Sequence, residues 1–441
     1  MNPIDSPIDT PTPTPTARRI LRFWLPLEAT WLMMAAEGPF LAAVIARLPA
    51  AKENLAAFGV ATALAWIVES PIIMMLSASN ALVRDKIAYR KLRRFSLALN
   101  AAVTAIMAVM ILPPVFDVVA RRGIGLSPDV AAIAGQSIVF LVLWPAAIGF
   151  RRFYQGILIR DHRPQAVTYG TVIRLAAMTV TGLVLALAVK LPGASVGAGA
   201  LGIGVIAEGL ASWAMARRSI RALNAQPEGE CAFGRDLTRS SVLKFYAPLA
   251  LTSVLSFFIN PLTSFFLARG KMPLESLAVL PVIVGLAFIF RTAGIAIQEV
   301  VIACRGDEGA NRPPLRRFSL RLGAIASLSF GAVVLTPLGG FWYRTVSGLT
   351  PDLAAFTVLP GILLVLLPFL EAVLSFQRGV LVRIHRTAPI SFAVAVQLGA
   401  TTAAYVLGVL GLGLPGAVVV GPALSLGYIA STALLAANLR R

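Results

Sequence analysis

Twelve long apolar stretches decide what this chain can fold into. Each is long enough to cross a bilayer, because a membrane-spanning helix needs roughly 20 apolar residues. The stretches lie at approximately 20–46, 55–80, 95–119, 130–157, 165–189, 196–216, 243–268, 277–303, 318–340, 352–378, 388–409 and 413–437. Charged residues make up only 13% of the 441 residues, against about a quarter in soluble domains. We therefore predict an all-α integral membrane protein with twelve transmembrane helices and no sizeable domain outside the membrane.

The basic residues are concentrated on one side of these spans. The two termini and the connections after spans 2, 4, 6, 8 and 10 hold 29 of the 39 lysines and arginines, and only Arg174 and Arg291 fall within the membrane. Loops rich in lysine and arginine stay in the cytoplasm, so both termini are predicted to be cytoplasmic. The net charge of +19 then reflects topology and contact with anionic membrane lipid, and we expect no nucleic-acid binding. The excess of arginine over lysine, 33 against 6, indicates a GC-rich coding sequence and favours a bacterial inner membrane.

The chain contains the same unit twice. Adding 222 to the numbers of the first span reproduces eleven residues of the seventh, including Pro39 as Pro261. With an offset of 223, the hexapeptide LRRFSL at 92–97 recurs at 315–320, and His162 recurs as His385. Six spans per unit is an even number, so the two units have the same orientation and form a parallel repeat. Two such halves can rock about a central site, which favours an alternating-access transporter.

The repeat also sets the domain boundaries. A proline–threonine run at 11–16 predicts a disordered cytosolic tail at 1–17. A six-helix bundle at 18–216 is followed by a charged cytosolic linker at 217–240, which surrounds Cys231, and by a second six-helix bundle at 241–441. The cytosolic side is reducing, so Cys231 and Cys304 are expected to be free thiols.

Three segments carry a resemblance to a known group of transporters. They are RFWLPLEAT at 22–30, its echo KFYAPLALT at 244–252, and FYQGILIRDHRP at 153–164. They resemble the multidrug/oligosaccharidyl-lipid/polysaccharide (MOP) flippase superfamily, which includes the multidrug and toxic compound extrusion (MATE) transporters. Within it, the sequence is most similar to the progressive ankylosis (ANK) proteins. The resemblance implies a V-shaped 6+6 fold, spans 1, 2, 7 and 8 facing a central cleft, and export of an organic solute.

Glu37 is the first candidate for substrate binding or ion coupling. It lies near the middle of span 1, and Pro39 removes a backbone hydrogen bond beside it, which softens the helix. Span 7 repeats the predicted hinge as Pro261, with Asn260 beside it, but has no carboxylate there. A charge in only one half suits a coupling site in one lobe, although a static buried hydrogen bond is the alternative.

A second candidate is the pair formed by Glu69 and Arg291, which differ by 222 and so occupy equivalent positions in spans 2 and 8. Charges inside a membrane normally face a cavity or a partner. They are read as a gate or substrate contact between the lobes, with a fixed pair or separate partners as alternatives. Gln298 and Glu299 extend this polar stripe toward the cytoplasm. Three further carboxylates are given structural roles, at headgroup level for the first and in pairs within a lobe, with Arg174 as a candidate partner, for the others: Glu28, Glu208 and Glu371.

The sequence favours transport over catalysis. It contains no nucleotide-binding signature and no HExxH motif, and its two histidines fall in cytosolic segments, so we expect no catalytic residues, metal or cofactor. We expect a monomeric secondary transporter that exports a small organic or amphiphilic substrate against H⁺ or Na⁺. The alternatives are a flippase for lipid-linked or amphiphilic cargo and an organic-anion exporter of the progressive ankylosis type. Four carboxylates against one arginine in spans 1, 2, 7 and 8 lean toward cationic or proton-coupled traffic.

Overall fold

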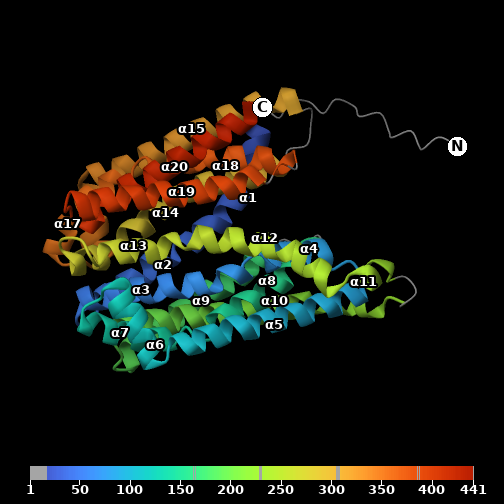
Figure 1. The fold of residues 1–441 in the computed structure, drawn as a ribbon, viewed down its shortest axis with the longest axis horizontal. Coiled ribbons are helices and arrows are strands. Elements are labelled where there is room, and N and C mark those ends of the chain that lie inside the picture. Colours follow the sequence, from blue (N-terminus) through green and yellow to red (C-terminus); the bar gives the residue numbers. More distant parts are fainter. Residues whose placement is uncertain are drawn as a thin grey trace.

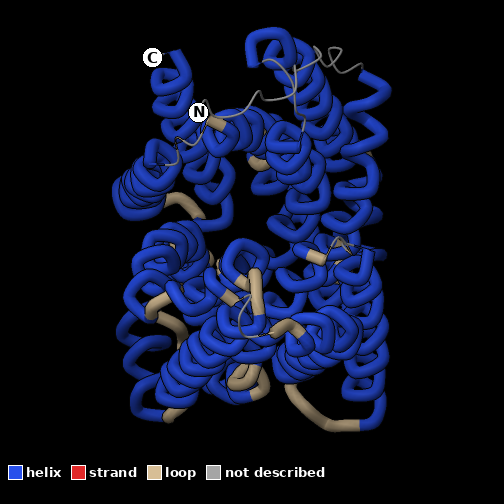
Figure 2. Tube along the Cα trace, turned by 90° about the vertical axis from the view of Figure 1, so that its right-hand side faces the viewer, coloured by secondary structure: helices blue, strands red, loops and turns tan. Residues whose placement is uncertain are grey.

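The computed structural model describes residues 17–161, 163, 165–227, 231–303, 308–384, 386 and 388–440. This part of the chain is helical and contains no strand, apart from an isolated bridge between Lys271 and Pro415. Eleven helices are long and apolar enough to cross a membrane, and a pair bent by 42°, Pro128–Val139 with Trp144–Arg160, makes a twelfth span. The prediction of a twelve-helix membrane fold is confirmed. Figure 2 shows how short most connections between the helices are.

The spans form two bundles, which we call the N lobe and the C lobe (Figure 1). The N lobe consists of α1 (Ala17–Ala35), α2 (Glu37–Ala46), α3 (Ala51–Glu69), η1 (Ser70–Ile72), α4 (Met75–Leu82), α5 (Lys86–Met110), α6 (Pro113–Asp117), η2 (Val118–Ile124), α7 (Pro128–Val139), α8 (Trp144–Arg160), α9 (Gln165–Ala188) and α10 (Gly193–Ala225). The short α11 (Ala232–Asp236) lies in the linker. The C lobe consists of α12 (Arg239–Phe257), α13 (Ile259–Leu267), α14 (Pro273–Ala303), α15 (Glu308–Leu335), α16 (Pro337–Phe341), η4 (Trp342–Val346), α17 (Pro351–Leu363), α18 (Leu367–Arg383), α19 (Ala388–Tyr405), η5 (Val406–Gly411) and α20 (Gly416–Arg440).

The two ends of the molecule are distinct. The end of α20 and the linker helix α11 lie at one end, on the right in Figure 1, which we call the terminal end. The connections around α7, α13 and α17 lie at the other, the distal end. By the charge distribution of the sequence, the terminal end is the one predicted to face the cytoplasm.

The backbone repeats the irregularities that an internal repeat predicts. The first span is interrupted by a turn at Ala36 and the seventh by a turn at Phe258, which is 222 residues later. Each distal connection after the third and ninth spans contains a π-helix followed by a glycine with positive φ, Gly125 at +92° and Gly348 at +72°. Only glycine adopts this left-handed conformation without strain. The breaks and turns therefore occupy equivalent positions in the two units.

Halves of two spans are exchanged between the lobes. The first span crosses over: α1 packs mainly against α14 of the C lobe, while α2 packs against both lobes. Reciprocally, α12 contacts η1 of the N lobe as well as α19 of its own lobe. The distal part of the interface is formed by α3 and α14, where a Cβ at Gly59 would lie only 3.1 Å from Cγ of Pro281. These two residues differ by 222, so the pseudo-twofold axis passes close to them.

Several predicted boundaries are wrong. The third span was expected at 95–119, the ninth at 318–340 and the sixth at 196–216, whereas the helices are α5, α15 and α10, which begin or end about nine to ten residues away. Hydropathy detects only the apolar part of a helix, and amphipathic turns rich in arginine extend it beyond the membrane. The linker between the two bundles is shorter than the predicted 217–240, because α10 continues to Ala225 and α12 begins at Arg239.

Candidate functional site

A chain of buried charges inside the N lobe begins at Glu37. Glu37 is the first residue of α2, directly after the turn at Ala36, and the Pro39 ring removes the backbone donor that would bind the carbonyl of Ala35. Pro39 packs against the C lobe, where it lies within 3.3 Å of a Cβ built at Gly285. Glu37 points the other way, into the N lobe, because residues two apart lie on nearly opposite faces of a helix.

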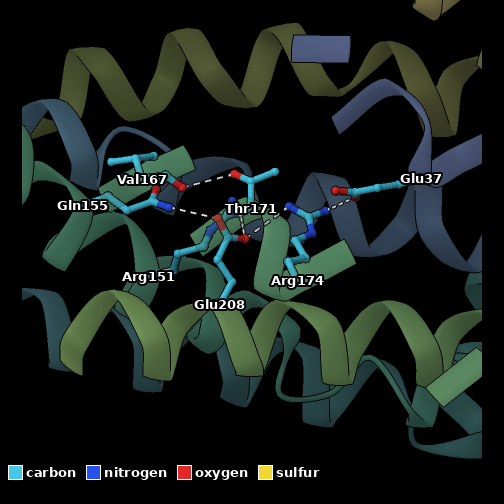
Figure 3. Close-up of polar contacts among 7 residues, drawn as sticks. All are labelled: Glu37, Arg151, Gln155, Val167, Thr171, Arg174 and Glu208. Atoms are coloured by element: carbon cyan, nitrogen blue, oxygen red, sulfur yellow. Dashed lines mark hydrogen bonds and ion pairs between the residues drawn. The ribbon is translucent and has the colours of Figure 1, made fainter. Parts of the chain in front are cut away.

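Glu37 is bound by Arg174 of α9, and the chain of charges continues from there (Figure 3). A second nitrogen of Arg174 lies 3.6 Å from Glu208 of α10, so this guanidinium stands between two carboxylates. Arg151 of α8 binds the same oxygen of Glu208, Oε2, and Gln155 donates a hydrogen bond of 3.0 Å to the other oxygen, Oε1. We call Glu37, Arg174, Glu208, Arg151 and Gln155 the N-lobe network.

The N-lobe network is buried and formally neutral, with two carboxylates and two guanidiniums. Glycines let the helices that carry it approach closely, since Gly170 of α9 faces the Glu208 side chain and Gly204 of α10 faces the backbone of Arg174. Removing one partner of such a buried pair leaves an uncompensated charge, at about 3 to 5 kcal/mol. Glu37 nevertheless keeps one unused acceptor, because its Oε1 is buried without a hydrogen-bond partner among the described residues. A proton or a small cation would satisfy that oxygen.

The predicted contact between Glu69 and Arg291 is not formed. Arg291 instead binds Glu371 of α18 through two nitrogens, at 2.6 and 3.2 Å, and Tyr428 of α20 at 2.5 Å. Tyr428 in turn donates to Glu371 at 2.8 Å, which closes a compact C-lobe network. Glu69 is buried in the N lobe, and its Oε2 has no partner among the described residues. Equivalent positions in a repeat need not touch, and each of these two charges turns into its own lobe.

The predicted pairing of Glu208 and Glu371 within their lobes is confirmed, including the pairing of Glu208 with Arg174. Glu28 differs from its predicted role at headgroup level. It is buried against the C lobe, where it accepts a hydrogen bond of 2.7 Å from Thr292 of α14. The crossover of α1 is the reason, because it carries Glu28 onto α14.

Asn260 has a local function in the helix break of the seventh span. Its side-chain amide donates to the carbonyl of Phe257, at 3.1 Å. That carbonyl is the one that Pro261 leaves without its backbone donor, four residues on. Asn260 therefore supplies the hydrogen bond that Pro261 cannot donate. Gln298 and Glu299 lie near the terminal end of α14, where Gln298 is partly buried and Glu299 is exposed.

Two hydrogen bonds between equivalent positions of the repeat join the lobes. The indole of Trp24 donates to the carbonyl of Ala293 at 3.1 Å, and the hydroxyl of Tyr246 donates to the carbonyl of Pro71 at 2.6 Å. Both donors and both acceptors differ by 222. These reciprocal bonds fasten α1 to α14 and α12 to η1.

The distal end carries a second reciprocal pair. Arg47 donates to the carbonyls of Thr345 and Val346 in η4, at 2.5 and 2.9 Å. Its counterpart Arg269 donates to carbonyls at the end of η2, namely those of Arg122 at 3.3 Å, Gly123 at 2.8 Å and Ile124. Beside them, Lys52 and Glu275 form an ion pair of 2.7 Å between α3 and α14. We call Arg47 and Arg269 with their carbonyl acceptors the distal latch.

Sequence reasoning missed several of these residues. Arg151 was counted with a cytosolic loop although it lies on α8, four residues before Gln155 and therefore on the same helix face. Tyr428, Trp24 and Tyr246 carry no charge, so a search for charges in the membrane cannot find them. The offset of 222 between Trp24 and Tyr246 is the signal that was available.

No group of three or more His, Cys, Asp or Glu residues that could hold a metal occurs in the described part of the chain. Among the cysteines described, Cys231 is buried and free. His162, His385, Cys304 and most of the predicted tail at 1–17 lie outside the described residues.

Solved structures with the same fold exist. An inward-facing multidrug resistance MATE family transporter of the MOP superfamily is similar with a TM-score of 0.71 and 14% identity, over 95% of this chain and 99% of that one. The lipid II flippase MurJ, in an inward closed conformation, gives 0.68 and 14% over 95% and 88%. An outward-facing MATE family transporter gives 0.63 and 14% over 96% and 95%. No protein-family profile and no curated protein matches the sequence.

These likenesses establish a MATE-like fold of the MOP type. They support the wider resemblance stated from the sequence, while the closer likeness to progressive ankylosis proteins stays a prediction.

Proposed function

We propose that this protein is a secondary transporter that works by alternating access and couples transport to a cation, H⁺ or Na⁺, at Glu37. The observation that carries the proposal is the N-lobe network: a carboxylate at a helix break, bound by an arginine that has a second carboxylate in reach, with one buried oxygen left open. A membrane enzyme would need catalytic groups for which neither sequence nor geometry gives a basis.

The network provides a way to couple the cation to movement. Neutralising Glu37 removes its attraction for Arg174, and Glu208 then remains as the one carboxylate shared by Arg174 and Arg151. The α2 helix is then held less firmly to α9. Because the turn at Ala36 separates α2 from α1, and α1 is already docked on the C lobe, loosening α2 changes how the first span bridges the lobes. Binding and release of the cation would thereby bias the rocking of the two lobes.

We further propose that the conformation described is closed at the distal end, which we take as the outside. The distal latch and the contact of α3 with α14 support this, as does the higher TM-score with the inward-facing than with the outward-facing MATE transporter. The proposal keeps the predicted setting: a bacterial inner membrane, cytoplasmic termini and a monomeric transporter.

For cargo, we propose an organic solute, with cations preferred. Arg291 is neutralised by Glu371 within the C lobe, and Glu299 is an exposed carboxylate near the terminal end of α14. Spans 2 and 8 therefore offer no free basic group to a ligand between the lobes. This argues against the organic-anion alternative.

Flipping of an amphiphilic or lipid-linked cargo is the second candidate, favoured by the similarity to the lipid II flippase over 95% of this chain. It requires a lateral opening to the bilayer. The bonds from Trp24 to Ala293 and from Tyr246 to Pro71 tie the first and seventh spans to the opposite lobe, so we expect one of them to break when the lobes part sideways. Transport of a water-soluble cation has no such requirement.

The test uses purified protein in vesicles with an imposed pH or sodium gradient and ethidium as a fluorescent organic cation. We expect Glu37→Gln to abolish gradient-driven uptake, while exchange of ethidium without a gradient persists. The matched control is Glu53→Gln, which removes a carboxylate from the distal start of α3, outside the network. Equal gradient dependence in Glu37→Gln and in the unmodified protein would contradict coupling at Glu37.

A further inference from the structure

A cavity of about 320 Å³ lies at the terminal end of the N lobe, away from the interface between the lobes. It is bounded by α5, α8 and α10 and receives no residue from spans 1, 2, 7 or 8. Four arginines line it, Arg90 and Arg93 from α5 and Arg217 and Arg221 from α10, and none of the residues that line it is acidic. The cavity is therefore strongly positive and separate from the proposed transport path.

Aromatic side chains form the walls of this cavity. Tyr89 and Tyr154 are buried there, and Trp213 holds the guanidinium of Arg217 over its ring at 4.1 Å. A stacked arginine keeps all its N–H donors free in the ring plane for another partner. Buried rings therefore form the walls of the cavity, and one of its exposed arginines is held in place by stacking.

Most of this charge has no partner among the described residues. Arg93, Arg217 and Arg221 make no hydrogen bond or ion pair within the part of the chain that the structure describes. Neighbouring charges behave differently: Lys91 donates to the carbonyls of Gly234 and Leu237, at 2.8 Å each, and so ties α5 to the linker. Arg93, Arg217 and Arg221 are therefore available to an external anion.

The cavity lies at the depth of lipid headgroups. The α10 helix has 33 residues and is about 50 Å long at 1.5 Å per residue, whereas the hydrocarbon core is about 30 Å thick. Its last turns, from Trp213 to Ala225, therefore extend past the acyl chains on the terminal side. Positive pockets between transmembrane helices at this level suit phosphate headgroups.

We propose that this cavity binds the phosphate groups of an anionic phospholipid, and that a lipid with two phosphates, such as cardiolipin, fits it best. Arginine pairs with phosphate through two parallel hydrogen bonds, and Arg93, Arg217 and Arg221 together offer enough donors for two phosphates. A soluble compound with the same chemistry, such as pyrophosphate, is the other source of such a group. The proposal does not depend on the proposed transport function. The cavity and the N-lobe network both involve α8 and α10, but they have no residue in common.

The experiment measures binding to the purified full-length protein in detergent, by thermal unfolding during titration and by native mass spectrometry. The ligands are cardiolipin, phosphatidylglycerol, phosphatidylcholine and inorganic pyrophosphate. The pocket variant is Arg93→Gln with Arg221→Gln. Its matched control is Arg94→Gln with Arg218→Gln. These two exposed arginines lie on the same two helices, each directly after an arginine of the cavity, but they are not part of its lining.

We expect cardiolipin to raise the unfolding temperature in a saturable way and to bind about tenfold to thirtyfold more weakly to the pocket variant, but less than about twofold more weakly to the control. Trp213→Leu removes no charge and should also weaken binding, since Arg217 loses its support. Should the pocket variant fail to fold, Trp213→Leu alone decides. Binding of pyrophosphate but not of lipid, lost in the same variants, would support the site and assign a soluble ligand. Equal losses in pocket and control variants, or no preference of the unmodified protein over phosphatidylcholine, would overturn the proposal.

Discussion

The distal latch should control how readily the distal end opens, and the structure gives the size of the effect. Arg47 makes two and Arg269 three hydrogen bonds to carbonyls of the opposite lobe. Both arginines are exposed, so water competes and each contributes far less than a buried charged hydrogen bond. About 1 kcal/mol per arginine is a reasonable magnitude, which corresponds to about a fivefold shift of the equilibrium toward the distally open state. The two together should shift it about thirtyfold.

The acceptors explain why an arginine is needed at these positions. Each latch binds the last carbonyls of a π-helix, which carry partial negative charge and lack donors of their own. Gly125 and Gly348 turn the chain away immediately afterwards, and a Cβ at Gly348 would lie 2.9 Å from Nη1 of Arg47. Lysine has one nitrogen and cannot bridge adjacent carbonyls in the same way, so Arg47→Lys should lose most of the effect.

The assay is electron–electron distance measurement between spin labels at Lys190→Cys in the N lobe and Thr350→Cys in the C lobe, both exposed distal positions, after replacement of the native cysteines. We expect Arg47→Ala with Arg269→Ala to increase the longer-distance population. The control is Arg121→Ala, since Arg121 is an exposed distal arginine whose partner, Asp117, belongs to its own lobe. An equal shift in that control, or an unchanged distance distribution in the double variant, would refute the latch.

Two further outcomes follow from the packing. Charge reversal of both Glu69 and Arg291 should not restore the stability that either single change loses, because Arg291 is bound to Glu371. Arg291→Gln alone should destabilise the protein by about 3 to 5 kcal/mol, measured by denaturation in mixed micelles. Gly149→Ala would place a Cβ 2.1 Å from the side chain of a neighbouring helix and should lower the unfolding temperature, whereas Gly38→Ala meets no atom within 4 Å and should not; equal behaviour of the two would contradict the packing.

The fold was predictable because its two strongest signals are physical and repeated. Twelve apolar stretches require twelve spans, and the matching prolines and LRRFSL segments give the parallel repeat. Helix ends were not predictable at the same level. The basic turn of α5 around Arg90 and the extension of α10 to Ala225 are amphipathic, so a hydropathy pattern excludes them although their backbone continues the helix.

The candidate site was predictable in part. Glu37 and the pairing of Glu208 with Arg174 could be inferred, because buried charges must find partners. The direction in which each charge points could not. Glu69 and Arg291 have equivalent depths, yet each turns into its own lobe, and only tertiary packing decides that rotation. The crossover of α1 onto the C lobe, which relocates Glu28, is likewise invisible in the order of spans.

The two halves of the chain are alike at the interface between the lobes and differ inside the lobes. Residues that hold the lobes together come in matched pairs, such as Trp24 with Tyr246 and Arg47 with Arg269, and each pair makes reciprocal bonds across the pseudo-axis. A rocking motion about that axis loads both edges alike, so divergence of one partner would leave the interface weak on one side. Inside the lobes no such constraint acts. There the N lobe has Glu37 where the C lobe has an isoleucine, and the two lobes build different charge networks. A symmetric interface around asymmetric lobes agrees with the proposed alternating-access transporter, whose proposed coupling site lies in one lobe.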